Sequence, residues 1–226
     1  MPAAGAPQIA DRVALVRAAI ADACTRAGRQ PGAVRLIAVT KASAPAVLPE
    51  LAAAGIRDFG ENRLEHLATM RAGAPAASTF HAIGRIQGRQ LATLAGMCDV
   101  LHSLCDADHM TRLERALAAA GRRLPVFIQV NAATDAAKAG VDPSELPARL
   151  ALARAQPHLE VVGLMTMAPL QDGHSEEAAA RRAFAALREL SRQHGLARLS
   201  MGMSDDYVAA VEEGATDVRI GRALFP

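Results

Sequence analysis

Lys41 is the residue of this sequence whose position most clearly suggests chemistry. It follows directly after Leu36-Ile-Ala-Val-Thr40, an apolar run typical of a β-strand. Strand alternation places Lys41 on the same face as Ile37 and Val39. In such apolar surroundings the pKa of a lysine falls, because burial disfavours the ammonium form, and the free amine can attack an aldehyde. We therefore predict a lysine that forms a Schiff base; a solvent-facing lysine just past the strand is the alternative.

A second feature is a turn rich in glycine and serine near the end of the chain. Leu199-Ser-Met-Gly-Met-Ser204 reads as a strand end and a tight turn, and Asp205 then begins a helix that Ser204 is expected to cap. Val218-Arg-Ile-Gly-Arg222 supplies further backbone N–H groups. Because converging N–H groups and helix N-termini bind phosphate, we predict an anion site here. A well-capped helix without a ligand is the alternative.

The amine and the anion site together select a class of ligand. The ligand must carry a carbonyl group at one end and a phosphate group at the other. Pyridoxal 5′-phosphate (PLP) has both groups, and so do phosphorylated aldoses and ketoses. The residues alone therefore predict a ligand of one of these two kinds.

Short strand-like runs alternate with longer helical runs along the whole chain. The expected strands are residues 34–40, 58–61, 80–84, 100–103, 126–131, 161–165, 199–202 and 218–221, and the expected helices are 46–54, 63–71, 91–96, 111–120, 145–155, 176–194 and 205–213. This alternation predicts parallel βαβ units, and eight strands in this length predict a (β/α)8 TIM barrel. A doubly wound open sheet is the alternative, but no Gly-x-Gly-x-x-Gly opens a helix after the first strand.

Helix boundaries carry recognisable signals. Ser175 and Asp142-Pro143 are expected to start helices. Gly55, Gly121, Gly195 and Gly214 are expected to end four of them. The chain from residue 1 to 226 is expected to be a single domain, in which an N-terminal helix within residues 1–30, around residues 8–26, packs on the barrel after the last strand.

Polar residues are concentrated where the expected strands end. In TIM barrels the functional site lies at the C-terminal ends of the strands, and the strand bodies are expected to be apolar. The residues at these ends include Lys41, Glu61-Asn62, His81, Met165, Ser200 and Arg219. From the residues alone, His81 reads as a hydrogen-bonded core histidine, and Met165 and Met203 as core residues.

Composition excludes several classes of protein. The 226 residues are 51% hydrophobic and 21% charged, with a net charge of +2 and 3% aromatics, so we expect neither disorder nor nucleic-acid binding. We expect no membrane span, because no run approaches roughly 18 apolar residues. Three cysteines without Cys-x-x-Cys spacing predict no disulfide framework and no metal site. A monomeric cytoplasmic protein is expected.

Seven motifs in order carry a resemblance to a known family. They are Ala38-Val-Thr-Lys41, Asp58-Phe-Gly-Glu-Asn62, Phe80-His-Ala-Ile-Gly84, Ile128-Gln-Val-Asn131, Gly163-Leu-Met165, Leu199-Ser-Met-Gly-Met-Ser204 and Val218-Arg-Ile-Gly221. From about residue 34 to residue 225, the chain resembles the pyridoxal phosphate homeostasis proteins, which are single-domain relatives of the alanine racemase N-terminal barrel. The resemblance implies a PLP-binding barrel that holds or delivers the cofactor with little or no catalysis.

The resemblance also implies roles for particular residues. Lys41 would hold PLP as an aldimine, and Arg219 would face the pyridine nitrogen. The remaining cofactor-binding residues implied are Asn62, His81, Met165, Ser200, Met203, Ser204, Ile220, Gly221 and Arg222. Because a guanidinium keeps its proton, Arg219 would donate to an unprotonated ring nitrogen, which makes the ring a poor electron sink.

The sequence departs from the family pattern in two places. Gln87-Gly-Arg-Gln90 replaces a Gln-Ser-Asn-Lys-like run, and Arg222 replaces a common threonine, which removes a hydroxyl contact to phosphate and adds a cation. PLP-dependent apo-enzymes are the expected recipients of the cofactor, and the change at residues 87–90 alters any partner surface there.

Two catalytic alternatives remain open from the sequence. A Schiff-base lyase acting on a phosphorylated sugar would need a proton shuttle beside the lysine, and Glu61 is the candidate. A weak amino-acid racemase would need a second acid/base, which full racemases take from a β-rich second domain. The given sequence leaves no room for that domain, and its only tyrosine, Tyr207, is expected on a helix surface.

Overall fold

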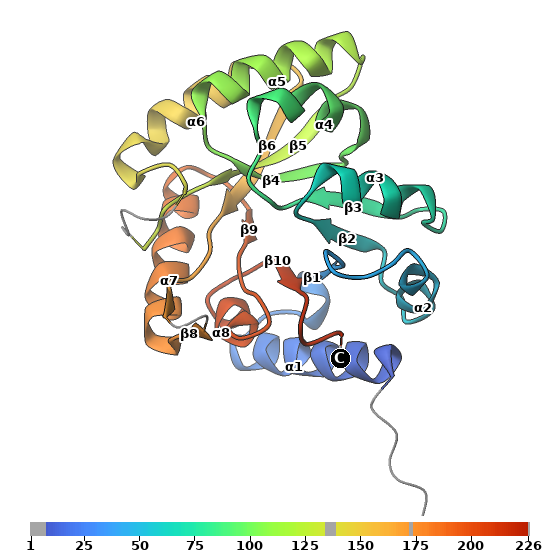
Figure 1. Cartoon of the computed structure of the whole chain (residues 1–226). Helices are drawn as coiled ribbons and strands as arrows, with labels where there is room; N and C mark the ends of the chain where they lie inside the picture. Colours follow the sequence, from blue (N-terminus) through green and yellow to red (C-terminus); the bar gives the residue numbers. More distant parts are fainter. Residues whose placement is uncertain (1–7, 134–138, 172–173, 226) are drawn as a thin grey trace, which may run out of the picture.

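Eight parallel strands close into a barrel (Figure 1). The structure is a computed structural model that describes residues 8–133, 139–171 and 174–225. Around the barrel the strands run in the order β1-β10-β9-β6-β5-β4-β3-β2. Their bounds are β1 (Arg35–Val39), β2 (Asp58–Glu61), β3 (Thr79–Ala82), β4 (Val100–Leu104), β5 (Leu124–Gln129), β6 (Leu159–Met165), β9 (Arg198–Ser200) and β10 (Asp217–Ile220). The predicted TIM barrel is confirmed.

Helices surround the barrel on the outside (Figure 1). They are α1 (Ile9–Arg26), α2 (Val47–Ala53), α3 (Leu64–Ala72), α4 (Leu91–Met97), α5 (Ala107–Ala119), α6 (Leu146–Arg154), α7 (Glu177–Gln193) and α8 (Tyr207–Glu212), with short 3-10 turns at Pro31–Ala33, Gly88–Gln90 and Pro143–Glu145. Helix α1 packs against α2 and α8, and so covers the part of the barrel where no helix follows β10 among the described residues.

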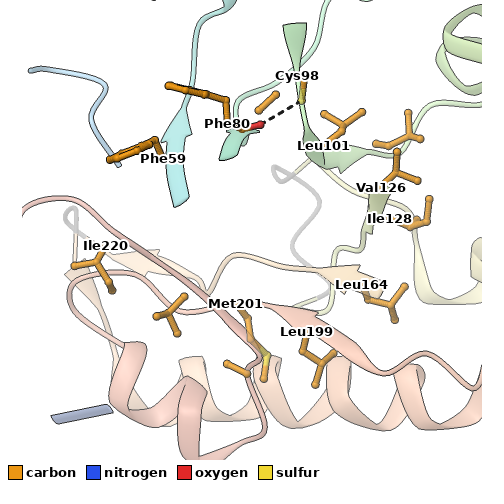
Figure 2. Packing of buried hydrophobic residues seen from close by; sticks show 14 of the residues in the cluster. Phe59, Phe80, Cys98, Leu101, Val126, Ile128, Leu164, Leu199, Met201 and Ile220 are labelled. Carbon is orange, nitrogen blue, oxygen red and sulfur yellow. Dashed lines mark hydrogen bonds between the residues drawn. The ribbon is translucent and has the colours of Figure 1, made fainter. Parts of the chain in front are cut away.

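The main core lies between the barrel and the helices. Helix α7 shows why the sequence folds this way, since it buries Ala180, Ala183, Phe184 and Leu187, which share one face at helical spacing. The strands contribute their outward residues to the same core. Figure 2 shows Phe59 and Phe80 on neighbouring strands. Their ring centroids lie 5.6 Å apart. Apolar burial on this outer face therefore fixes which side of each strand faces inward.

The inside of the barrel is much more polar than expected. Strand β10 is an example, because Val218 and Ile220 join the outer core while Asp217 and Arg219 alternate with them and are buried on the other side. Other inward charged or polar side chains are Arg35, Asp58, His81, His102 and Ser200. The expectation of apolar strand bodies is wrong. Most apolar residues of these short strands face the outer core, and the residues that alternate with them point into the barrel and include polar ones.

Several helix boundaries also differ from expectation. Glu176, not Ser175, is the N-cap of α7, since Ser175 belongs to a two-stranded antiparallel sheet of β7 (Leu170–Gln171) and β8 (His174–Ser175). Helix α5 starts four residues earlier than predicted, because the Asp106 carboxylate accepts the His109 N–H at 2.9 Å. The four predicted terminal glycines all have positive φ angles, from 61° to 106°, which confirms them as helix ends.

Candidate functional site

Lys41 lies at the rim of the barrel, just after β1. Strand pairing places Ala38 beside Ile220 of β10, and Val39 beside Gly60 of β2. The C-terminal ends of these three neighbouring strands therefore bring Lys41 close to the turns that begin at Gly221 and Asn62. The Lys41 side chain is exposed, so the expected apolar surroundings are wrong: the chain leaves β1 at Val39, and Lys41 belongs to the open turn that follows.

The turns after β9 and β10 present unused backbone donors. The Ser204 hydroxyl accepts the Ala223 N–H at 3.3 Å and so links the two turns. Within the described part of the chain, no hydrogen bond uses the N–H groups of Ser204, Gly221 or Arg222. Gly221 itself lies against β1, since a Cβ built on it would be 3.6 Å from Val39. Free backbone amides in neighbouring turns are the kind of donor that binds phosphate, so these three amides are the candidate anion site.

Two expectations about these turns need correction. Ser204 does not cap α8, because the Asp206 carboxylate accepts the Met203 N–H at 2.6 Å and Asp206 is the N-cap. With six residues, α8 is also too short to act as a strong helix dipole. The guanidinium of Arg222 is exposed and paired with Asp205, so its charge is already compensated. The candidate anion site therefore consists mainly of turn amides and does not include the end of a long helix.

Arg219 is held rigidly inside the barrel below the rim. Its Nη1 donates to the Ser200 hydroxyl at 2.5 Å, and its Nη2 donates to the Thr166 carbonyl at 3.0 Å. Burial lowers the pKa of Arg219 to about 10, and the carboxylates of Asp206 and Asp217 oppose that effect, so the side chain stays cationic at neutral pH. It is therefore a fixed donor near the floor of the mouth.

Four other predicted cofactor residues lie beneath the rim rather than on it. His81 and Ser200 are fully buried and hydrogen-bonded, and Met165 packs against Val100 and Phe127 inside the barrel. The Ile220 side chain belongs to the outer core, so only its backbone faces the rim. Asn62 is exposed at the rim, and Met203 is half-buried in the turn. The mouth thus brings together Lys41, Asn62, Met203, Ser204, Gly221 and Arg222.

Glu61 is turned away from the mouth. Its Oε1 accepts the Thr40 hydroxyl, and its Oε2 lies 2.6 Å from Nδ1 of His66. The other nitrogen of His66 is 3.1 Å from the Ser43 carbonyl oxygen. The buried carboxylate therefore ties the start of α3 to the turn that carries Lys41. It stabilises the position of that turn and is not directed at the amine.

A hollow of about 770 Å³ opens at the opposite end of the barrel. It is lined by the turns that precede the strands and by α1, including Arg17, Arg35, Arg57, Asp58 and Asp217. None of the residues predicted to bind a cofactor lines it. The hollow therefore does not define the site at the mouth, although it leaves one end of the polar interior open to water.

Sequence reasoning missed His102 and Asp58. His102 Nε2 lies 2.9 Å from His81 Nδ1, and His102 Nδ1 lies 2.7 Å from the Ser200 hydroxyl. Asp58 Oδ1 lies 2.9 Å from His81 Nε2. A polar residue at the same depth in successive strands was the available signal, but the order and register of the strands were needed to interpret it.

We predict that His102 makes the protein less stable in acid. Burial, reinforced by the positive charges of Arg219, Arg198 and Arg35, holds the pKa of His102 well below its usual 6.5. Below pH 6.5 the unfolded chain therefore takes up a proton that the folded chain refuses, and the free energy of unfolding falls by up to about 1.4 kcal/mol per pH unit. Above that pH the residue is neutral in both states and contributes no slope.

Urea unfolding at several pH values between 5 and 8 tests this prediction. The His102→Gln variant should show a shallower fall in acid than the parent chain. Equal slopes in the two proteins would contradict the inference that His102 is buried without its proton.

Fold and site define a class of protein. They describe a (β/α)8 barrel with a lysine amine and turns with unused backbone N–H groups at the ends of neighbouring strands. Among the described residues, no group of three or more His, Cys, Asp or Glu side chains is arranged to hold a metal ion. No helix in these residues combines the length and apolarity needed to cross a membrane.

Comparison with known proteins identifies the family. Residues 16–226 match the family "Alanine racemase, N-terminal domain". A pyridoxal phosphate homeostasis protein of Pseudomonas aeruginosa is 41% identical over 220 residues, which cover 96% of this chain and 94% of that protein. The chain therefore belongs to the pyridoxal phosphate homeostasis protein family, which shares the N-terminal barrel of alanine racemase.

Two solved structures of one relative match the fold closely. PipY of Synechococcus elongatus PCC7942 with PLP bound has a TM-score of 0.82 at 34% identity, covering 97% of this chain and 100% of that chain. The same protein without PLP has a TM-score of 0.85 at 35% identity over the same shares. The resemblance predicted from the sequence motifs is confirmed.

Proposed function

We propose that this chain binds PLP covalently through Lys41 and holds it for delivery to other proteins, with little or no catalysis of its own. The observation that supports the proposal is the pairing of β1 with β10, because Lys41 follows β1 while Gly221 and Arg222, whose amides no described hydrogen bond uses, follow β10. PLP supplies an aldehyde for the Lys41 amine and a phosphate for the amides of Gly221 and Arg222. The PLP-bound relative PipY supports the choice of this ligand.

The donor set of the mouth fits this ligand. Lys41 is exposed and so reachable by an aldehyde from solvent, and the turn N–H groups can donate to a phosphate without giving up an existing hydrogen bond. Arg219 is held by Ser200 and Thr166, and as a guanidinium it cannot take a proton from a ring nitrogen. PLP, when bound, supplies an electrophilic ring system, and a donor that leaves the ring nitrogen unprotonated would make that ring a weaker electron sink than a protonated pyridinium.

The surroundings of Lys41 support a binding role more than catalysis. A Schiff-base lyase needs a free acid/base beside the amine, and the obvious candidate, Glu61, is already bonded to Thr40 and His66. Tyr207 is half-buried at the start of α8, and burial raises its pKa, which makes it a poor base at neutral pH. These contacts disfavour the lyase and provide no second base for racemisation.

The remaining parts of the proposal concern the cellular setting. We infer that the barrel is the whole PLP-binding unit, that the protein works in the cytoplasm as a monomer, and that PLP-dependent apo-enzymes receive the cofactor. The exposed Lys41 supports delivery, because an incoming amine can reach the bound aldehyde carbon from the open mouth. Sedimentation of the purified chain, with and without PLP, tests the monomer.

Peptide mapping tests the proposed function. Lys41 and Lys138 are the only lysines in the sequence, and Lys138 lies outside the described residues. The protein should be incubated with PLP, reduced with borohydride and digested, and the peptides analysed by mass spectrometry. We expect the reduced cofactor on the peptide that contains Lys41. Attachment only at Lys138 or at the N-terminal amine would contradict the proposal.

The same experiment separates the carrier from the lyase. Cofactor-free protein should be reduced in the presence of a triose phosphate as a parallel sample. We expect much less labelling of Lys41 by the sugar than by PLP at equal concentration. Equal or greater labelling by the sugar would favour the lyase.

A further inference from the structure

A single file of hydrogen bonds crosses the inside of the barrel behind Arg219. It joins Asp58 of β2, His81 of β3, His102 of β4, Ser200 of β9 and Arg219 of β10. The successive donor–acceptor distances are 2.9 Å, 2.9 Å, 2.7 Å and 2.5 Å. Both imidazole rings and the hydroxyl are fully buried, so water does not compete for these contacts.

When both imidazole rings are neutral, the two ends of this file fix the direction of every bond in it. A guanidinium can only donate and a carboxylate can only accept. Ser200 therefore accepts from Arg219 and uses its own proton to donate to Nδ1 of His102. His102 then donates from Nε2 to Nδ1 of His81, and His81 donates from Nε2 to Asp58. This arrangement satisfies every group with both histidines neutral and protonated at Nε2.

The direction excludes a proton conduit. A conduit needs a group at each end that can both gain and lose a proton, and Arg219 stays protonated at neutral pH. Ser200 has one proton, which is committed to His102. The ring of His102 is also held in place, since it stacks on Phe127 with centroids 4.4 Å apart. The file is therefore a static support.

We propose that Asp58, His81 and His102 are positioning residues that act through Ser200 on Arg219. By taking the Ser200 proton, they leave only its oxygen lone pairs to Arg219, so the guanidinium is held at one angle by Ser200 and the Thr166 carbonyl. Two of its five N–H groups are used in this way, and its guanidinium makes no other hydrogen bond with the described residues. At Arg219 the mouth therefore offers only hydrogen-bond donors, and these select a ligand atom that accepts a hydrogen bond.

The proposal rests on the proposed function only for the identity of that ligand atom. The orientation of the file is a property of the chain itself and is testable without PLP. Cooperative hydrogen bonding makes the file sensitive at every member, because each donor is polarised by the next. Removing a residue of the file that is remote from the mouth should therefore change the orientation of the Arg219 guanidinium.

Nitrogen NMR of the histidine rings tests the orientation in the unmodified protein. The seven histidines are labelled with ¹⁵N, and the two rings are assigned with single His→Gln variants. We expect His81 and His102 to be neutral and protonated at Nε2 at pH 7. We also expect Ser200→Ala to shift the Nδ1 signal of His102 without changing which nitrogen carries its proton. A proton on Nδ1 of either ring would overturn the proposal.

Cofactor binding tests the positioning role. His102→Phe keeps the shape of the ring and removes both hydrogen bonds, whereas His102→Gln retains a donor and an acceptor. We expect His102→Phe to weaken PLP binding by roughly tenfold and to shift the absorption band of bound PLP. His102→Gln should keep most of the parent's PLP affinity and band position. His109→Phe is the matched control, because the structure gives its ring no hydrogen bond among the described residues.

The outcomes separate this proposal from the proposed function. If the parent protein binds PLP and His102→Phe binds it with the same affinity and spectrum, the positioning role is wrong while the proposed function stands. If the rings show the expected protonation but the parent protein takes up no PLP, the proposed function is wrong while the static support stands.

Discussion

Replacing Lys41 by alanine should abolish the fixation of PLP by borohydride. Reduction traps only an imine between the cofactor aldehyde and an amine, and Lys138 is the only other lysine in the sequence. The turn amides and Arg219 remain in the variant, so we expect residual noncovalent binding that is weaker by at least about tenfold and that inorganic phosphate displaces. Absorption spectroscopy and mass spectrometry before and after reduction measure both effects.

The fold itself should not change in this variant. The Lys41 side chain is exposed and makes no hydrogen bond with the described residues, so Lys41→Ala should alter the free energy of unfolding by less than about 0.5 kcal/mol. Loss of fixation then reports on the amine and not on unfolding. Lys138→Ala is the control and should fix PLP as the parent does. Full fixation by Lys41→Ala would locate the covalent link elsewhere.

The barrel and the neighbours of Lys41 were predictable from sequence because they depend on local patterns. Apolar alternation at residues 34–40 and 218–221 indicates two strands, and barrel closure brings the first strand beside the last. Lys41 and Gly221 then lie at the same end of adjacent strands without any knowledge of side-chain contacts. The glycines that end helices carry an equally local signal, since they adopt positive φ angles.

The interior was not predictable, because its contacts depend on register and depth. His102 and Ser200 are 98 residues apart in the chain, and β4 and β9 are not neighbours around the barrel. Their contact requires both side chains to point inward at matching heights. From the sequence, Glu61 is the candidate proton shuttle beside Lys41, but its side chain lies on the outer face of β2 and contacts Thr40. Gly60 and Asn62 lie on the inner face.

A methyl group at Gly84 should be among the most damaging single changes near the mouth. A Cβ built on Gly84 would lie 2.1 Å from the Asn62 carbonyl oxygen and 2.8 Å from the Asn62 carbonyl carbon. Both are backbone atoms, so no side-chain rotation relieves the contact. The Gly84 carbonyl is also fixed, since it accepts the Ser103 hydroxyl at 2.6 Å. We expect Gly84→Ala to lower the free energy of unfolding by more than about 3 kcal/mol in urea titrations.

The control for this prediction is Gly96→Ala in α4. A Cβ there meets no atom within 4 Å, so the substitution should raise the free energy of unfolding by about 0.5–1 kcal/mol and leave PLP binding unchanged. In Gly84→Ala, by contrast, the turn at Asn62 must move, and this turn lies beside Lys41 through the pairing of β1 with β2. PLP affinity should therefore fall in any Gly84→Ala protein that remains folded. If Gly84→Ala has the stability and PLP affinity of the parent, Gly84 and the Asn62 carbonyl group do not approach this closely. The presence of glycine at the end of the Phe80–Gly84 motif would then need another explanation.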